Sequence, residues 1–380
     1  MSVNNSIKLV ILGFGLGLES STILCRWLFE PETRDFDLED LVVLTMMTGG
    51  EWDSTGHLVT THILPLLRAH NIRFVQVGRA GPSQKHDGIV VLDDSRQPEM
   101  LHIKGKYRLD EELKAAGTLP TWRPFSRTCS IKTKAVPGDT WIRQTFGDRP
   151  FRHVLGFNAD ELKRVERDKS YATSTRHVEH PLVEWGWDRA KCEAYLFEKF
   201  GVTWLKSACK CCAFSNGKTE VLERYNREPE AAYEVLEMEK ISMSLNPAVH
   251  LFPKGSLRES LLVQGYGHLV DEADARMAVK PWALYRIRRI ARSKRIVYRK
   301  VEYVATGSQA GMADALAGKA ASLGIALTHE GGIARCYLRR RDAAHPLEEM
   351  YVAAPSGVEA KSRKCFEHFW AALNQPRLFS

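Results

Sequence analysis

Long apolar segments are absent from this sequence of 380 residues. No apolar run approaches the roughly 20 residues that a membrane-spanning helix needs. The first residues lack the apolar stretch and cleavage site of a secretory signal peptide, and lead instead into the strand-like segment KLVIL. Low-complexity tracts are missing too, and the eight cysteines, four of them between residues 192 and 212, do not form an evenly spread disulfide framework. We therefore expect a cytoplasmic globular protein with reduced cysteines.

The glycine-rich segment LGFGLGLESS, residues 12–21, lacks the residues that two common nucleotide-binding loops need. A dinucleotide-binding loop follows G-x-G-x-x-G and uses an acidic residue after the second strand. Here Leu18 stands where the third glycine would be, and the second apolar run ends in TMMTGG without an acid. A Walker loop needs Gly-Lys followed by Ser or Thr, which is absent as well. The segment therefore predicts neither an NAD site nor a Walker P-loop.

Apolar runs alternate with helix-like segments over the first part of the chain. This alternation is typical of β-α-β units that build a parallel sheet with both faces covered. The fold class that we expect is α/β: a Rossmann-like doubly wound parallel sheet, with a cysteine-containing helical segment and a smaller α+β C-terminal region. The expected strands lie at residues 7–14, 41–49, 72–78 and 150–161, and the expected helices at 20–29, 54–70 and 187–201, the last ending at Gly201.

The pattern changes after residue 218, where a long helical stretch, 218–243, begins. The tail combines a helix at 311–324 with short strands near 332–341 and 349–354. We expect a nucleotide-binding domain with a cysteine site at 1–215, a helical segment with a basic patch at 216–300 and a small α+β region at 301–380.

Residues 281–300 contain eight Lys or Arg and no Asp or Glu, so this stretch alone equals the net charge of +8 of the chain. Trp282, Tyr285 and Tyr298 are interleaved with the basic residues. Basic side chains with aromatic neighbours are typical of a nucleic-acid interface. A solvated helix face beside a strand is the alternative that the composition leaves open.

A glycine-rich turn between a strand and a helix suits the phosphates of a nucleotide. Backbone N–H groups and the helix N-terminus attract anionic oxygens. Ser20 and Ser21 add hydroxyl donors, and Glu19 can act through a metal ion bound to the phosphates. The loop therefore predicts a site for the phosphates of a nucleotide with a bound Mg²⁺.

The same loop resembles the PP-loop of the ATP pyrophosphatases, whose pattern is Ser-Gly-Gly-x-Asp-Ser. Gly17, Glu19 and Ser20 match its second glycine, its acid and its second serine. Gly15 and Leu16 stand in place of the first serine and the first glycine, so the match is partial.

Five later segments resemble the PAPS-reductase-like branch of this superfamily, in the order that the branch has them. They are MTGGEWDSTG (47–56), TCSIKTKAVP (128–137), GFNADELKR (156–164), HPLVEWGWDRAKCEAYL (180–196) and SACKCCAF (207–214). In the last segment Ala213 stands in place of the proline of the branch. The resemblance covers residues 7–215 and leaves the rest of the chain without a counterpart.

The resemblance implies roles for individual residues. Lys132, Lys134 and Arg164 are candidates to clamp the polyphosphate, while His153, inside an apolar strand, is expected to be a core histidine. The implied catalytic residues are Lys132, Cys129, Asp160 and Glu161. The implied ATP-binding residues are Gly13, Gly15, Gly17, Glu19, Ser20, Ser21, Thr48, Gly49, Gly156 and Arg164.

The cysteines of the last segment have the spacing of a metal site. Cys209 and Cys212 are separated by two residues, which is a chelate spacing, and Cys129 can complete a set of three thiolates. Three cysteines leave one iron of a [4Fe–4S] cluster open to bind sulfur or substrate. We therefore predict that Cys129, Cys209 and Cys212 hold a [4Fe–4S] cluster.

Two other interpretations of these cysteines stay open. Thiolates also bind zinc, for which His180 or Cys192 is a candidate fourth ligand. Cys211 lies between the pair and can replace either member. Reduced, partly buried cysteines without a metal are the second alternative.

The family resemblance implies an ATP-dependent sulfur-transfer enzyme. It would adenylate a carbonyl oxygen of a nucleobase-like substrate, release pyrophosphate and replace the oxygen with sulfur. The substrate is a free purine-like molecule, or tRNA or DNA bound through residues 280–300. A sulfur donor is a further expected partner, and a homodimer is the expected assembly.

The sequence is also compatible with two alternative functions. One is a sulfonucleotide reductase, for which Cys365 is the nearest nucleophile, although it lacks the Glu-Cys-Gly context of that branch. The other is a non-catalytic module that binds nucleotide or nucleic acid, which the two altered PP-loop positions favour and the three retained cysteines oppose.

Overall fold

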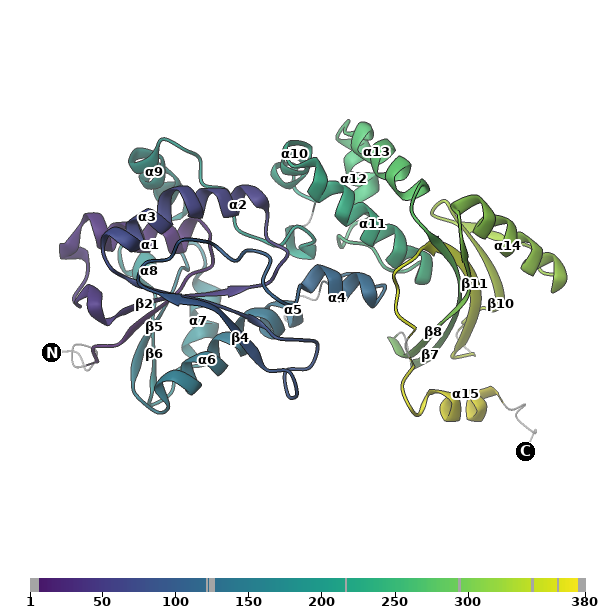
Figure 1. Cartoon of the computed structure of the whole chain (residues 1–380), viewed down its shortest axis with the longest axis horizontal. Coiled ribbons are helices and arrows are strands. Elements are labelled where there is room, and N and C mark those ends of the chain that lie inside the picture. Colours follow the sequence, from purple (N-terminus) through teal and green to yellow (C-terminus); the bar gives the residue numbers. More distant parts are fainter. Residues whose placement is uncertain are drawn as a thin grey trace. The chain divides into compact units, whose positions relative to one another are not determined.

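The computed structural model describes residues 7–120, 122, 127–215, 217–292, 295–342, 345–360 and 362–374. The chain forms two compact units (Figure 1). The first contains residues 1–110 and 123–210, and the second contains residues 111–122 and 211–380. Within the described ranges, no helix has the length and apolar character that crossing a membrane would require.

The first unit is built on a six-stranded sheet of order β4-β3-β2-β1-β5-β6. All neighbouring strands are parallel except β3 and β4, which are antiparallel. The predicted α/β class and Rossmann-like sheet are therefore confirmed. The strands are β1 (Val10–Gly13), β2 (Leu41–Met47), β3 (Arg73–Arg79), β4 (Ile89–Ser95), β5 (Phe151–Leu155) and β6 (Arg176–Glu179).

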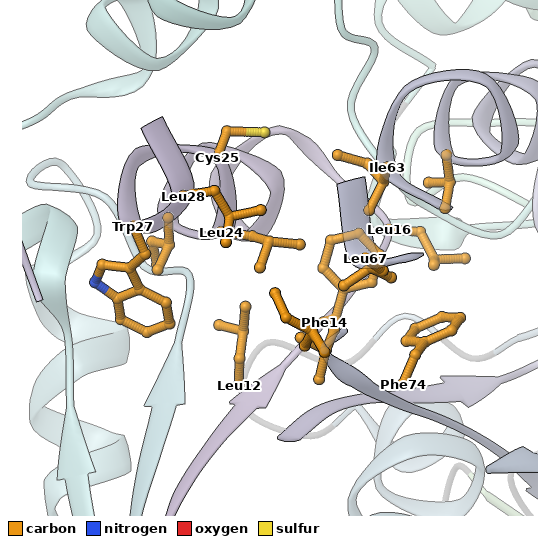
Figure 2. Close-up of a cluster of buried hydrophobic side chains, with 14 of the residues drawn as sticks. Leu12, Phe14, Leu16, Leu24, Cys25, Trp27, Leu28, Ile63, Leu67 and Phe74 are labelled. Atoms are coloured by element: carbon orange, nitrogen blue, oxygen red, sulfur yellow. The ribbon is translucent and has the colours of Figure 1, made fainter. Parts of the chain in front are cut away.

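Helices cover both faces of this sheet, as the alternating apolar pattern predicted. On one face, Leu12 of β1 belongs to a buried cluster with Leu24 and Leu67 (Figure 2). On the other face, Ile11 belongs to a cluster with Trp141. The helices of the first unit are α1 (Leu18–Phe29), α2 (Asp53–Leu58), α3 (Leu64–Ala69), α5 (Thr128–Ser130), α6 (Val136–Phe146), α7 (Leu162–Lys169), α8 (Pro181–Glu184) and α9 (Arg189–Phe200). Most of α4 (Leu109–Ala115) belongs to the second unit.

Proline interrupts two helical regions, of which the sequence predicted only the first. The expected helix at 54–70 contains a π-helical turn, Val59–Ile63, immediately before α3. A second π-helical turn, Ile131–Ala135, precedes α6. Pro65 and Pro137 occupy the first turn of the α-helix that follows in each case. Since proline has no N–H to donate to the preceding turn, the regular hydrogen-bond ladder is broken there.

The second unit contains a five-stranded antiparallel sheet of order β8-β7-β11-β10-β9. Ile241 and Leu245 of α11 pack on one face, and Met312 and Leu316 of α14 pack on the other. The strands are β7 (Trp282–Arg292), β8 (Arg295–Gly307), β9 (Thr328–Glu330), β10 (Ile333–Arg339) and β11 (Leu347–Pro355). The helices are α10 (Thr219–Arg227), α11 (Pro229–Leu245), α12 (Leu257–Val263), α13 (Gly267–Ala278), α14 (Gln309–Ser322) and α15 (Phe366–Asn374).

Two expectations for this unit need correction. The long helical stretch is two helices, α10 and α11, because Pro229 begins a new helix. Residues 281–300 include no helix among their described positions, because they form β7 and the part of β8 at 295–300. The alternative that this stretch forms a solvated helix face was therefore wrong. Strand β8 also runs through residue 300, where the sequence suggested a boundary.

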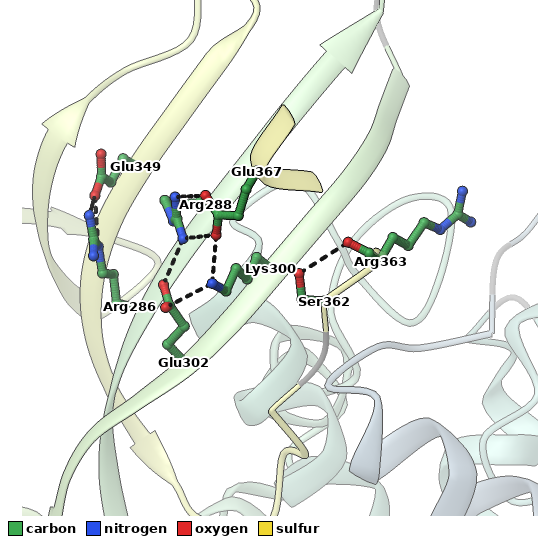
Figure 3. Close-up of polar contacts among 8 residues, drawn as sticks. All are labelled: Arg286, Arg288, Lys300, Glu302, Glu349, Ser362, Arg363 and Glu367. Carbon is green, nitrogen blue, oxygen red and sulfur yellow. Dashed lines mark hydrogen bonds and ion pairs between the residues drawn. The ribbon is translucent and has the colours of Figure 1, made fainter. Parts of the chain in front are cut away.

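Glutamates from other segments neutralise much of the basic stretch (Figure 3). Arg286 pairs with Glu349, Arg288 with Glu302 and Glu367, and Arg289 with Glu348. Lys300 also pairs with Glu302 and Glu367, while Arg299 donates to the carbonyl of Gly117. Five of the eight basic residues are therefore bound within the unit, which the local composition did not reveal.

Candidate functional site

The strand order places a switch point between β1 and β5. From β1 the chain builds β2 and β3 on one side, and later places β5 and β6 on the other side. In such sheets ligands bind outside the carboxyl ends of the strands at this point. The loop from β1 to α1 and the loop from β5 to α7 both leave the sheet here. They touch closely, because a Cβ on Gly156 would lie 2.8 Å from the backbone nitrogen of Ser20.

The loop after β1 has the backbone of a ligand-binding turn. Leu16 has a φ of 62°, a left-handed conformation that glycine adopts more readily. This is the position at which the PP-loop pattern has its first glycine. No heavy atom lies within 4 Å of a Cβ built on Gly15, so space is open beside it. A strained non-glycine residue next to open backbone is typical of functional sites.

The predicted phosphate contacts at the start of α1 occupy different environments. Gly17 is the N-cap residue of α1, and no side chain caps that helix end. Glu19 is half-buried, and its Oε1 accepts a long hydrogen bond of 3.4 Å from Asn158 Nδ2. Ser20 is buried and donates to the carbonyl oxygen of Gly17 at 3.3 Å. Ser21 is fully buried, and its hydroxyl has no hydrogen-bond partner among the described residues.

Gly13 differs from the other predicted contacts in the loop. It belongs to β1, and a Cβ there would stand 2.6 Å from Leu155 Cδ2 of the adjacent strand. This glycine therefore allows β1 and β5 to pack closely.

The loop after β5 contributes Asp160 and Glu161, and the first turn of α7 contributes Arg164. Asp160 is exposed, and its N–H donates to Asn158 Oδ1 at 3.1 Å. Glu161 forms an ion pair with Arg164, whose guanidinium lies 4.3 Å from the centre of the Phe157 ring. Arg164 remains 47% exposed, so it can reach an anion at the edge of the sheet.

Glu51 is a site residue that the sequence did not single out. Its side chain is 1% exposed, and Oε2 has no hydrogen-bond partner among the described residues. Its other oxygen, Oε1, lies 3.2 Å from Thr48 Oγ1 and 3.2 Å from Lys134 Nζ. Burying a carboxylate with an unsatisfied oxygen is costly unless a ligand or a function compensates. The segment MTGGEWDSTG contained Glu51, but its burial depends on tertiary packing.

The segment at 207–210 lies against both glycine-containing loops. Ser207 Oγ would be 2.6 Å from a Cβ on Gly17. Cys209 Sγ lies 3.4 Å from Thr48 Oγ1 and 4.0 Å from Glu51 Oε1. The backbone N–H of Lys210 donates to the carbonyl oxygen of Gly50 at 2.7 Å. A sulfur atom is thereby placed beside the carboxyl end of β2.

Gly49 shapes the same corner of the site. Its φ of +80° is left-handed, and a Cβ there would stand 2.6 Å from the carbonyl oxygen of Lys104. Both features require glycine at this position.

The predicted lysines lie on the π-helical turn Ile131–Ala135. Lys134 pairs with Glu51, as described above, and remains 29% exposed. The carbonyl oxygen of Lys132 accepts a hydrogen bond from Gln84 at 2.9 Å. Cys129 precedes the turn, is half-buried and has its carbonyl oxygen bonded to Thr133 Oγ1 at 2.8 Å. π-helical turns occur frequently at functional sites.

The predicted cluster ligands belong to different parts of the chain. Cys129 and Cys209 are in the first unit, whereas Cys211 and Cys212 begin the second. Cys211 is 1% exposed, and Cys212 is half-buried. Among the residues that the structure describes, no three His, Cys, Asp or Glu side chains are grouped so that they could hold a metal ion. The ligand set stays a prediction.

The candidate fourth zinc ligands have other roles in the described structure. His180 Nε2 lies 3.0 Å from Asp168 Oδ2, and the ring stacks on Phe157. Burial raises the pKa of the Cys192 thiol to about 12, which disfavours the thiolate that zinc needs.

His153 is a buried core histidine, as predicted. Its Nδ1 accepts a hydrogen bond of 2.8 Å from Arg176 Nε, and Arg176 also pairs with Asp168. Burial, assisted by the charge of Arg176, lowers the pKa of His153 to about 3. The ring is therefore neutral near pH 7.

No family model and no curated protein matches this chain in sequence.

Proposed function

We propose that this chain is a cytoplasmic ATP-dependent thiolation enzyme of the PP-loop type. A carbonyl oxygen of a nucleobase-like substrate would attack the α-phosphorus of ATP, and pyrophosphate would leave. The carbon then carries an adenylate, which is a good leaving group, and a sulfur nucleophile displaces AMP. ATP, Mg²⁺ and a sulfur donor are the reactants that this reaction needs.

The switch point between β1 and β5 is the observation that carries this proposal. The loops that hold Gly15, Glu19 and Gly156 meet there, in the place where open α/β sheets bind ligands. The uncapped N-terminus of α1 favours phosphate oxygens. Glu19 is suited to Mg²⁺ on these phosphates, and Arg164 supplies a positive charge that can stabilise the leaving pyrophosphate.

The position of Cys209 supports sulfur chemistry at the same edge. Its thiol contacts Thr48, and Glu51 and Lys134 lie beside it. Glu51 Oε2, which is buried and has no hydrogen-bond partner among the described residues, is the proposed acceptor for an N–H group of the substrate. A nucleobase amide offers such a group next to the carbonyl that would be activated.

A small nucleobase-like substrate is favoured over tRNA or DNA. Nucleic-acid binding depends on cations that can neutralise phosphates. In the stretch at 281–300, Arg286, Arg288, Arg289 and Lys300 already pair with glutamates. A salt-dependent gain of affinity for tRNA or DNA would reverse this preference.

A pyrophosphate-release assay with purified protein tests the proposal. Anaerobic protein is incubated with ATP, Mg²⁺ and a panel of free nucleobases, nucleosides and tRNA, and its iron and sulfide contents are measured in parallel. We expect substrate-dependent release that is lost in a variant combining Glu19→Ala and Ser20→Ala. A matched control changes Glu166→Ala, an exposed carboxylate on α7. Unchanged ATP binding in the double variant would show that the loop assignment is wrong.

The same assay separates the two alternatives. Iron without pyrophosphate release from any substrate would favour a sulfonucleotide reductase, for which Cys365 is exposed at the start of α15. ATP binding without iron or turnover would favour a non-catalytic module.

A further inference from the structure

A cavity in the second unit lies where several elements meet. Its volume is about 360 Å³, within the range of small-molecule sites. Lys240 of α11 and Asp274 of α13 line it, together with the start of β7 and of α14. The remaining lining residues are Ala275, Met277, Ala278, Trp282 and Gln309. A second cavity of about 540 Å³ shares Ala278, so the two adjoin.

The charges around this cavity do not balance. Asp274 is occupied by Arg258, which binds both of its carboxylate oxygens at 2.8 and 2.6 Å. Arg335, a second nearby cation, is fully buried and donates to the carbonyl oxygen of Ser244. Lys240 has no ion-pair partner among the residues that the structure describes. One positive charge therefore faces the cavity without a counter-charge.

The rest of the wall is mostly apolar. The Trp282 indole N–H already donates to the carbonyl oxygen of Met277 at 2.9 Å. Apart from Lys240 and Asp274, Gln309 supplies the remaining polar side chain in this lining. A ligand with one anionic group and a flat apolar body matches this surface.

We propose that this cavity is a binding site for a small organic monocarboxylate, with Lys240 as the counter-ion of its carboxylate. Burial, and the charges of Arg258 and Arg335, lower the pKa of Lys240, and the charge of Asp274 offsets only part of this effect. A bound carboxylate would restore that compensation and leave its apolar body against Met277 and Trp282. The site belongs to the second unit and does not depend on the proposed thiolation activity.

Calorimetric titration of the full chain with sodium benzoate, and with benzamide as its neutral isostere, tests this site. We expect saturable benzoate binding in the millimolar range or tighter, and no saturable binding of benzamide. Lys240→Met should weaken benzoate binding at least about tenfold, because a charge-assisted hydrogen bond is lost. Lys240→Arg should retain most of the affinity.

The controls make a negative result informative. Val279→Ser changes an exposed residue of the adjoining cavity and should bind benzoate like the unmodified chain. Thermal unfolding verifies that Lys240→Met remains folded. Equal affinity in Lys240→Met, equal affinity for benzamide, or no saturable benzoate binding to the unmodified chain would each overturn the proposal.

Discussion

Glu51 of the first unit and Glu367 of the second unit differ in how completely their carboxylate oxygens are hydrogen-bonded. In the second unit, Glu367 binds both Arg288 and Lys300, and Glu302 binds the same two cations (Figure 3). In the first unit, Glu51 is almost completely buried but satisfies only one of its carboxylate oxygens within the described structure.

This difference separates structural charges from charges that are available for function. A network in which every ion has opposite partners holds strands and a helix together, and the 56% exposure of Glu367 limits its contribution to stability. An unsatisfied buried carboxylate contributes little to stability by itself. Its position beside a thiol and a lysine is the reason that we propose a functional role for it.

The largest effect that we predict is on Glu51. Glu51→Gln should lower substrate-dependent pyrophosphate release about a hundredfold, because the proposed acceptor of a substrate N–H loses its negative charge. The melting temperature should change little, since Gln keeps the shape of the side chain. Glu367→Gln is the matched control and should keep full activity. Equal activity of Glu51→Gln and Glu367→Gln would show that Glu51 has no special role in the reaction.

The next effect concerns the glycines of the switch point. Gly156→Ala should destabilise the first unit by about 1–3 kcal/mol, because its Cβ meets the backbone of Ser20 at 2.8 Å. Gly15→Ala has open space and should leave stability unchanged while weakening ATP binding. Chemical denaturation and ATP titration measure the two quantities. If Gly15→Ala binds ATP normally, the nucleotide does not approach this backbone.

A third prediction concerns the pH dependence of stability. Burial holds the pKa of His153 at about 3 in the folded protein, below its ordinary value of 6.5. The unfolded chain therefore binds a proton more readily than the folded one in this interval. The stability that neutral His153 contributes is fully present above pH 6.5. It is lost as the pH falls toward 3, by up to about 1.4 kcal/mol per pH unit.

His153→Gln keeps an acceptor for Arg176 but does not titrate. Denaturation between pH 7 and pH 4 should show a flatter pH dependence for this variant than for the unmodified chain. Parallel curves would contradict the assignment of His153 as a neutral core residue.

The smallest effect belongs to Glu367 in the ion-pair network of the second unit. Hydrogen bonds from Arg288 and Lys300 lower the pKa of Glu367 to about 2 from its ordinary 4.5. Its contribution to stability is present above pH 4.5 and is lost as the pH falls through 2. Because the side chain is exposed, Glu367→Gln should cost less than about 1 kcal/mol at pH 7. A larger loss in thermal denaturation would mean that the network is essential to the second unit.

Much of the first unit followed from local sequence patterns. The apolar run ending at Gly13 and the helix-like segment from Ser20 predicted β1 and α1, and Gly201 ends α9 as expected, with a left-handed φ of 69°. These features depend on neighbours in the chain, so a single sequence reveals them. The pattern could not reveal the π-helical turn that contains Lys134 and that precedes Pro137.

The basic stretch and Glu51 show where local composition fails. Residues 281–300 contain no acid, but their partners Glu349 and Glu367 lie more than sixty residues away along the chain. Glu51 lies in the segment MTGGEWDSTG, and none of its neighbours in the sequence indicates that it is buried. Ion pairing and burial depend on contacts between distant residues, which the order of side chains does not specify.

The sequence by itself determined the α/β class, the position of the glycine-rich turn and the buried character of His153. Only the tertiary structure decided that the loops of Gly15 and Gly156 meet at one switch point, and that Cys209 lies beside Glu51. The physical reason is that periodicity reports which face of an element is buried. Strand order and long-range packing decide which loops, charges and thiols share that edge.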